Sequence, residues 1–410
     1  MLEGAITRRA VLAAGVLGGW LSGGEALADP GERDVLVLQT PGGGIQPQAV
    51  TDGRGVVHVL YFRGEARGGD LFYTRWNAAS EQWSSPMQVN RRAGSAVAAG
   101  TIRGGQLALG RGGRVHVVWN GSAKAAPPTP AHAFPVLYTR LDDRGTAFEP
   151  ERNLMRVSSV LDGGASVAAD REGRVYVGWH AQAAGRGSAE APHGGGAGHG
   201  GGDHSQARQV FLARSLDDGR TFAPERPVDT PSLGACPCCG VRMLADRAGG
   251  VHLLYRASEG GVNRDMVLLS APAPGERFVS RRLDAWAIRT CPMSSASLWD
   301  AERALLAAWE TQGQVHFAAL DGRTGKPSAV VTPEGAGGTR KHPVVVRRKD
   351  GQTLLVWTEG TGWQRGGALA WERFDRDGRV LGRRRLANAV PVWGLPTAAT
   401  LPDGRFLVIH

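Results

Sequence analysis

The sequence lacks the features that mark several protein classes. Hardly any segment of its 410 residues repeats its apolar positions with the 3.6-residue period of a helix. After residue 21 no apolar run is long enough to cross a membrane. These absences argue against a helical domain and against a membrane-spanning protein. The 60 glycines and the frequent turn signals indicate an all-β chain instead.

The sequence also lacks the aromatic residues that would accompany a basic nucleic-acid surface. The net charge is +10, but it is dispersed in short arginine groups such as Arg91-Arg92 and Arg383-Arg384-Arg385, without interleaved exposed aromatics. Such groups are typical of solvated strand edges that block aggregation. We therefore expect no nucleic-acid partner, and at most weak attraction to anionic glycans or lipid headgroups.

Residues 1–28 have the composition of a twin-arginine export signal. Arg8-Arg9 precedes an apolar run from Ala10 to Leu21, and Ala26-Leu27-Ala28 forms a small-x-small cleavage site. A membrane anchor is the alternative, but about a dozen apolar residues are too few to span a bilayer. The sequence predicts a mature protein from Asp29 onwards, in the periplasm or secreted.

One short pattern, G-x-V-H/Y-V-x-W/Y, recurs seven times along the chain. β-Branched and aromatic residues alternate over five positions in each copy, which predicts a strand. Successive copies end 58, 60, 76, 54, 48 and 53 residues apart, close to the length of one four-stranded propeller blade. The copies end at Tyr61, Trp119, Trp179, Tyr255, Trp309, Trp357 and His410.

Seven such strands predict a seven-bladed β-propeller that forms one domain over residues 29–410. Six blades are the alternative, if one copy belongs to an irregular closure. The last blade has only two strands left at the C-terminus, Pro396–Leu401 and Arg405–His410. We expect Asp34–Leu38 to complete this blade, because ring closure removes exposed strand edges.

The segment Ser215–Phe222 matches the pattern S-x-D-x-G-x-T-F, and degenerate copies occur at Leu141–Phe148 and Ser270–Phe278. In these residues the chain resembles the Asp-box (BNR) repeats of the sialidase-like propeller superfamily, over about residues 40–410. The box is a structural element: its Asp accepts backbone N–H groups of a turn, its Gly takes a positive φ, and its aromatic residue packs between sheets. The resemblance implies the fold and not an activity.

The four cysteines should meet on the opposite face of the ring from the Asp-boxes. Cys236, Cys238 and Cys239 lie in the connection into blade four, and Cys291 lies in the connection into blade five. Because connections of adjacent blades lie side by side, we expect the four sulfurs to converge. The pairing of C-x-C-C with a later C-P resembles a pattern in exported bacterial members of the sialidase-like group, to which no function is attached.

Two chemistries suit this cluster. Two disulfides would fit an oxidising compartment, although adjacent Cys238 and Cys239 could pair with each other only in a strained ring. The alternative is a thiolate site for a soft metal, with Cu(I) favoured and Zn(II) possible. Met293 and His342 are possible further ligands. The sequence alone does not decide between the disulfides and the metal site.

A Gly/His-rich loop at about residues 183–206 interrupts blade three. It carries His193, His199 and His204, and it should share the cysteine face. The composition is typical of a flexible segment with metal affinity, so these histidines could deliver the ion to the thiols. The alternative is an ordinary insertion with fortuitous histidines.

The residues that a catalytic sialidase needs are missing. The stretch Gly43–Pro47 stands where the family has Arg-Ile-Pro, and all five tyrosines fall within predicted strands. Arg242, Arg289 and Arg340 lie near channel-side connections and are candidates for weak anion binding. The sequence favours a non-catalytic exported propeller that binds a metal ion, an exported protein or a glycan. An exo-sialidase-type glycoside hydrolase or a lectin-like propeller for acidic sugars is the alternative.

Overall fold

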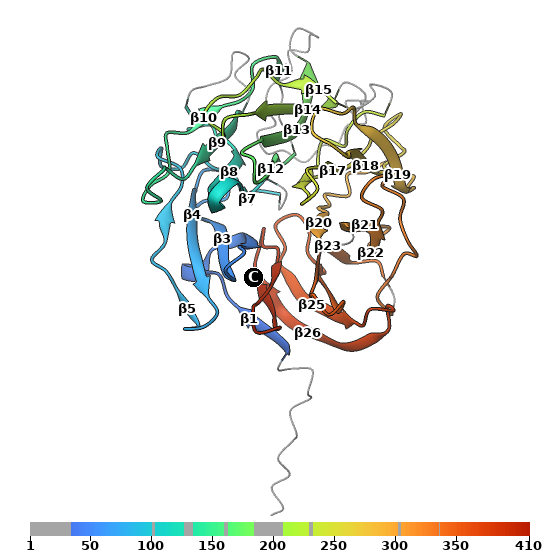
Figure 1. Cartoon of the computed structure of the whole chain (residues 1–410). Helices are drawn as coiled ribbons and strands as arrows, with labels where there is room; N and C mark the ends of the chain where they lie inside the picture. The colour runs from blue at the N-terminus through green and yellow to red at the C-terminus, as the bar shows by residue number, and fades with distance from the viewer. Residues whose placement is uncertain are drawn as a thin grey trace, which may run out of the picture.

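The computed structural model describes residues 34–100, 103–126, 134–159, 163–183, 208–228, 233–301, 305–335 and 337–410. In these ranges the regular secondary structure is strand, apart from short 3-10 turns such as η2 (Pro41–Gly43) and η3 (Arg111–Gly113). The strands form seven sheets around a central axis (Figure 1). None of the helical segments in these ranges has the length and apolar character needed to cross a membrane.

Each sheet is one blade, and six of the seven follow one another along the chain from β2 onwards. Blade one contains β2 (Ile45–Thr51), β3 (Val56–Arg63), β4 (Asp70–Asn77), β5 (Gln82–Trp83) and β6 (Met87–Gln88). Blade two contains β7 (Gln106–Leu109), β8 (Val115–Asn120), β9 (Val136–Arg140) and β10 (Arg152–Asn153). Blade three contains β11 (Ser158–Ser159), β12 (Ser166–Ala169), β13 (Val175–Ala183), β14 (Arg208–Ser215) and β15 (Arg226–Pro227).

The second half of the ring repeats this plan. Blade four contains β16 (Arg242–Ala245), β17 (Val251–Arg256), β18 (Met266–Ala271) and β19 (Val279–Asp284). Blade five contains β20 (Ser297–Asp300), β21 (Leu305–Thr311) and β22 (Gln314–Leu320). Blade six contains β23 (Arg340–Arg347), β24 (Thr353–Glu359), β25 (Gly367–Phe374) and β26 (Val380–Val390).

Blade seven closes the ring with both ends of the folded domain. β27 (Thr397–Thr400) pairs antiparallel with β28 (Phe406–Ile409), and β1 (Val35–Leu38) pairs parallel with β28. In Figure 1 the blue β1 lies beside the red C-terminal strands. The predicted seven blades and the predicted closure by the N-terminal strand are confirmed, and the six-bladed alternative is wrong.

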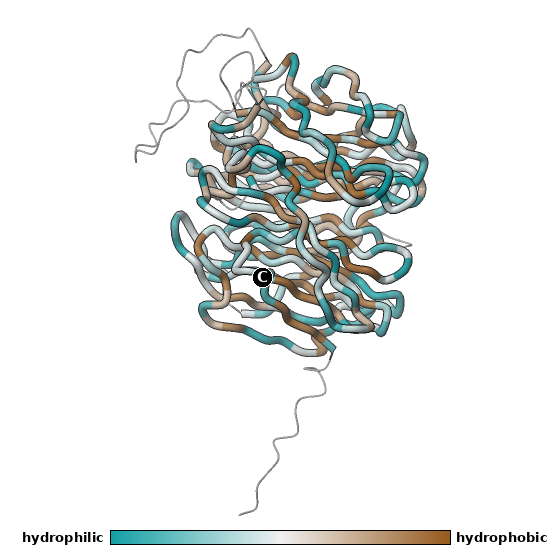
Figure 2. Tube along the Cα trace, turned by 90° about the vertical axis from the view of Figure 1, so that its left-hand side faces the viewer, coloured by the Kyte–Doolittle hydropathy of each residue, from teal (hydrophilic) through white to brown (hydrophobic). Residues whose placement is uncertain are grey.

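The core lies between the blades, because the alternating side chains of each second strand contact the two neighbouring sheets. Trp119, Trp179 and Trp309 from three of the repeats are at most 1% exposed. Truncating a buried tryptophan to alanine typically costs about 3–5 kcal/mol. In Figure 2 the hydrophobic stretches of the chain lie mostly within the body of the ring, and the hydrophilic ones gather at loops on its outside.

The Asp-box has the predicted structure. Asp217 Oδ1 accepts the backbone N–H of Thr221 at 2.8 Å, and Gly219 has a φ of 76°. The ring of Phe222 meets Tyr138 of blade two edge-on, with 4.7 Å between centroids. The box therefore fixes one turn and connects two blades.

Strand alternation gives the ring two different faces. The Asp-box face carries the turns between first and second strands and between third and fourth strands. The cysteine face carries the loops between second and third strands and the connections between blades. The first strands surround a central cavity of about 580 Å³.

Candidate metal centre

A tight turn forms the centre of the cysteine cluster. The backbone N–H of Cys239 donates to the carbonyl of Cys236 at 3.3 Å, with Pro237 at the second position. Proline is favoured there because its fixed φ suits the turn. Cys236 N–H also donates to the carbonyl of Arg256 in β17, and Gly240 N–H donates to that of Ser294. Blade four and the connection into blade five thus hold the turn from both sides.

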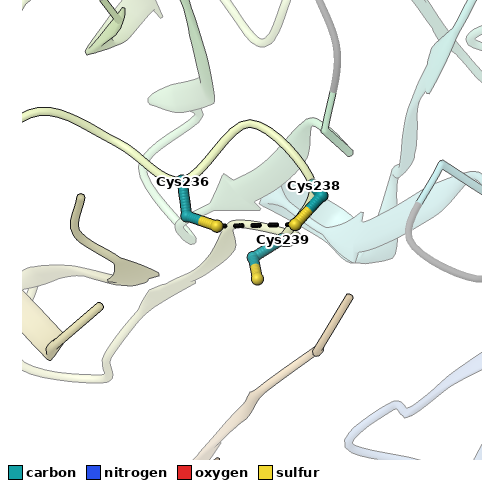
Figure 3. Close-up of side chains that lie close together, drawn as sticks. All are labelled: Cys236, Cys238 and Cys239. Atoms are coloured by element: carbon teal, nitrogen blue, oxygen red, sulfur yellow. Dashed lines mark hydrogen bonds between the residues drawn. The ribbon is translucent and has the colours of Figure 1, made fainter. Parts of the chain in front are cut away.

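Three sulfurs converge at this turn. The Sγ atoms of Cys236 and Cys238 are 3.5 Å apart, and those of Cys236, Cys238 and Cys239 all lie within 4.8 Å of one another (Figure 3). All four cysteines are free thiols, and Cys236 and Cys239 are buried. Three sulfurs bound to one ion at about 2.3 Å would be about 3.8–4.0 Å apart. The spacing therefore suits a shared metal ion without a large rearrangement.

Cys291 lies next to this group, as the sequence predicted. Contacts with the thiols of Cys236 and Cys238 lower the pKa of Cys291 to about 4. The thiols of Cys238 and Cys239 also lower the pKa of Cys236. Burial raises the pKa of Cys239 to about 12. The cluster thus favours a partial set of thiolates, and the remaining protons would have to be displaced by a metal ion.

A cationic shell that the sequence analysis missed surrounds the sulfurs. Arg264 Nη1 donates to Cys236 Sγ at 3.2 Å. The guanidinium of Arg256 is buried, lies 4.9 Å from the centre of the Trp286 ring, and donates to the carbonyl of Arg264 at 2.7 Å. Lys341 Nζ donates to the carbonyl of Pro292, the residue after Cys291. These cations favour a negatively charged site.

The Gly/His-rich loop begins close to the cluster. His180 Nε2 is 2.8 Å from the carbonyl oxygen of Cys239, and His180 is three residues before the end of β13 at Ala183. The packing here is tight, because a Cβ on Gly163 would be 2.1 Å from His180 Nε2. His193, His199 and His204 lie outside the described residues. Their part in metal delivery stays a prediction.

The other two proposed ligands lie beside the connection into blade five. Met293 is two residues after Cys291 and has a φ of 49°. His342 is buried, and its Nδ1 is 2.9 Å from Ser295 Oγ. Burial, with a smaller effect of Lys341, lowers the pKa of His342 to about 3, so the ring is neutral. Neither residue belongs to the three-sulfur group, and their role as ligands stays a prediction.

The three arginines suggested for anion binding lie in different surroundings. Arg340 pairs with Glu359 at 3.4 Å and lies over the Trp357 ring, and Arg289 is exposed. Only Arg242 of the three lines the central cavity.

All five tyrosines lie in strands and are buried. The hydroxyls of Tyr73 and Tyr138 are each 2.7 Å from the Nδ1 of a buried histidine, His58 and His116 respectively. Both histidines are therefore part of the packed interior of the blades. Within the stretch Gly43–Pro47, Gln46 Nε2 donates to the carbonyls of Ala98 and Trp393. Gln46 therefore supports two loops.

Comparison with known proteins supports the fold. No family model matches the chain, and no curated protein matches it. A protein of unknown function from Dyadobacter fermentans has a similar structure, with a TM-score of 0.51, 11% identity, and coverage of 80% of this chain and 93% of that one. A Hadza microbial sialidase has a TM-score of 0.51 and 14% identity, with coverage of 84% and 74%. Identities this low show a sialidase-like propeller fold and nothing about activity.

Proposed function

We propose that this protein binds one soft metal ion, Cu(I) in preference to Zn(II), through the cysteine cluster. The observation that carries the proposal is the convergence of Cys236, Cys238 and Cys239 sulfurs within 4.8 Å of one another. Thiolate sulfur is a soft ligand that selects Cu(I), zinc and iron–sulfur clusters over hard cations. Cys291 is the fourth sulfur and completes the set when the ion requires it.

Coordination number favours Cu(I) over Zn(II). Three sulfurs form the compact group, which suits a three-coordinate ion, whereas structural Zn(II) takes four ligands in a tetrahedron. Three thiolates and Cu(I) carry a net charge of −2, which Arg264 offsets in part through its N–H donated to Cys236 Sγ. Removal of the ion would leave an electrostatically unfavourable cluster of thiolates, which would take up protons instead.

Export completes the proposed role. Twin-arginine export carries folded proteins, so the ion could be loaded while the thiols are still reduced. His193, His199 and His204 would then sample or deliver the ion from a loop whose first residues follow His180. The exported protein would present its metal, or its cysteine face, to a protein or glycan partner.

The second candidate function is a sialidase-type hydrolase or a lectin-like binder of acidic sugars. The burial of all five tyrosines within strands argues against a tyrosine nucleophile. It does not argue against sugar binding. Robust release of a chromogenic leaving group from a sialoside would favour this candidate over the metal proposal.

Competition with a Cu(I) chelator tests the metal proposal. We expect the reduced protein to take up one equivalent of Cu(I), and the double variant Cys238→Ser, Cys239→Ser to lose stoichiometric uptake. Replacing His193, His199 and His204 together should slow loading and leave the final affinity nearly unchanged. Met155→Leu is the matched control, because it removes a buried sulfur in another blade. Equal uptake by the double variant would refute the proposal.

A further inference from the structure

The central cavity is closed at one end. It extends from Gln48 and Arg242 to residues 52–55, Arg247 and Lys349 on the Asp-box face. Beyond Arg242, toward the cysteine face, the free space falls from about 580 Å³ to a pocket of about 30 Å³. Arg242 therefore lies at the floor of a channel that opens on the Asp-box face.

The guanidinium of Arg242 has only neutral partners. Its Nε donates to the carbonyl of Ala296 at 3.3 Å, and its Nη1 donates to the side-chain oxygens of Gln48 and Gln106. No acidic side chain in the described ranges pairs with it, and the two N–H groups of Nη2 have no acceptor there. Burial lowers the pKa of Arg242 to about 10, so the group is charged at neutral pH. A partly buried cation without a counter-charge is stabilised when an anion joins it.

A hydroxyl donor borders the same cavity. Ser297 lines the cavity and follows Ala296, which accepts the Nε–H of Arg242. Its Oγ accepts the backbone N–H of Val345 at 3.0 Å, so its own proton remains available for a ligand. Guanidinium and hydroxyl together offer the donors that a carboxylate requires.

The mouth of the channel adds to the positive potential. Asp52 pairs with Arg54 at 3.2 Å, and Asp300 pairs with Arg247 at 3.5 Å. The exposed Lys349 is left as an additional cation at the rim. A cleft with low-dielectric walls and one sign of net charge concentrates the opposite ion.

We propose that the channel binds a small molecule through a single carboxylate, which enters from the Asp-box face and accepts hydrogen bonds from Arg242 Nη2 and Ser297. One carboxylate neutralises the uncompensated charge of Arg242, and the cavity volume lies within the range of small-molecule sites. Small wall residues such as Ala108, Ala168 and Ala245 leave space for the rest of the molecule. This site is independent of the metal cluster, which lies on the other face.

Calorimetric titration with glucuronate and benzoate tests the proposal, with glucose and benzyl alcohol as the uncharged counterparts. At constant ionic strength we expect saturable 1:1 binding of at least one carboxylate and none of its uncharged counterpart. Arg242→Gln should weaken that binding at least tenfold, and Ser297→Ala should weaken it about threefold. Arg340→Gln is the matched control and should leave binding unchanged, since that arginine is already paired with Glu359.

Two results would overturn the proposal: no binding of either carboxylate, or equal binding by Arg242→Gln. If this variant does not fold, crystals of the unmodified protein grown in bromide decide the matter. An anomalous peak beside Arg242 Nη2 would support the site, and a channel without bromide would refute it. Loading the cysteines with Cu(I) should not change carboxylate affinity, which separates this test from that of the metal proposal.

Discussion

The two faces of the ring are built in opposite ways. On the Asp-box face, carboxylates accept the backbone N–H groups of the turns between first and second strands, as Asp52, Asp170 and Asp246 do. Asp217 does the same in the Asp-box itself. Each of these carboxylates replaces hydrogen bonds that the turn would otherwise make to water. This face is therefore locally satisfied and repeats one device around the ring.

The cysteine face contains most of the strained backbone. Nine described non-glycine residues have positive φ, and seven of them lie on this face. The seven are Gln46, Met293, Gln312, His342, Gln364, Asn388 and Trp393. Each such conformation costs of order 1–3 kcal/mol and persists only where the surroundings hold it. The comparison indicates that the Asp-box face stabilises the ring and the cysteine face positions reactive groups.

The largest expected effect on stability comes from removing the buried carboxylate of Asp218 on the Asp-box face. Asp218 Oδ2 pairs with Arg114 Nε at 2.5 Å and with Arg140 Nη1 at 3.4 Å. Asp218→Ala would remove the one buried carboxylate between these two guanidinium groups, whose other partners Asp143 and Glu149 are more exposed. We therefore expect a loss of roughly 3–5 kcal/mol in the free energy of unfolding. Chemical denaturation measures this loss. Asp143→Ala is the control, because that carboxylate is exposed, and it should leave the midpoint almost unchanged. Equal effects of the two variants would contradict the comparison.

On the cysteine face, an arginine should affect metal binding more than folding. Arg264→Met removes the N–H donated to Cys236 Sγ, and we expect about tenfold weaker Cu(I) binding, which corresponds to about 1.4 kcal/mol. Chelator competition measures the affinity. Arg282→Met is the control on the same blade, since Arg282 pairs with Asp265 at an exposed position. An unchanged Cu(I) affinity in Arg264→Met would show that the cationic shell has no part in the site.

Acid should reduce the contribution of the Asp-box face to folding stability. Although burial opposes ionisation, the hydrogen bonds from Thr221 and Ser215 lower the pKa of Asp217 to about 2. Because the pKa is lower in the folded state, its stabilising effect is present above about pH 4 and is lost as the pH falls toward 2. After allowance for solvent screening we expect about 1 kcal/mol from this residue. Urea unfolding of the protein and of Asp217→Asn at several pH values should show that the free energy of unfolding falls less steeply with decreasing pH in the variant. Parallel declines would rule out this role.

The smallest expected effect on stability comes from relieving backbone strain on the cysteine face. Gln364 has a φ of 50°, so Gln364→Gly should leave stability unchanged or raise it by up to about 1 kcal/mol. Gln82→Gly, in strand β5, should instead lower stability by roughly 0.5–1 kcal/mol. Thermal unfolding of both variants distinguishes the two cases. A similar loss in both would mean that Gln364 carries no strain.

The repeat determined how much of this fold could be predicted. The period of aromatic-ended strands identified seven blades, and the few strands left at the C-terminus implied closure by Asp34–Leu38. Strand alternation was also enough to bring Cys291 to the other cysteines, because it fixes the face to which each connection belongs. These features depend on local pattern and connectivity alone.

The surroundings of the two sites could not be predicted in the same way. Arg264 contacts Cys236 across a loop, and Arg242 of blade four reaches Gln48 of blade one and Gln106 of blade two, so no motif or spacing connects them. The sequence did contain one indication that charged residues surround the cysteine cluster. Arg256 directly follows the aromatic end of a repeat, where a charged residue enters the protein interior and needs partners.

Metal analysis combined with thiol counting on freshly exported protein tests the central claim most directly. We predict about one copper ion for each chain, and four reactive thiols once a chelator has removed the metal anaerobically and without reductant, so that any disulfide stays intact. Cys238→Ser, Cys239→Ser protein prepared in parallel should contain no stoichiometric copper. Two disulfides and no stoichiometric metal in the unmodified protein would contradict the account and leave the cluster a structural one.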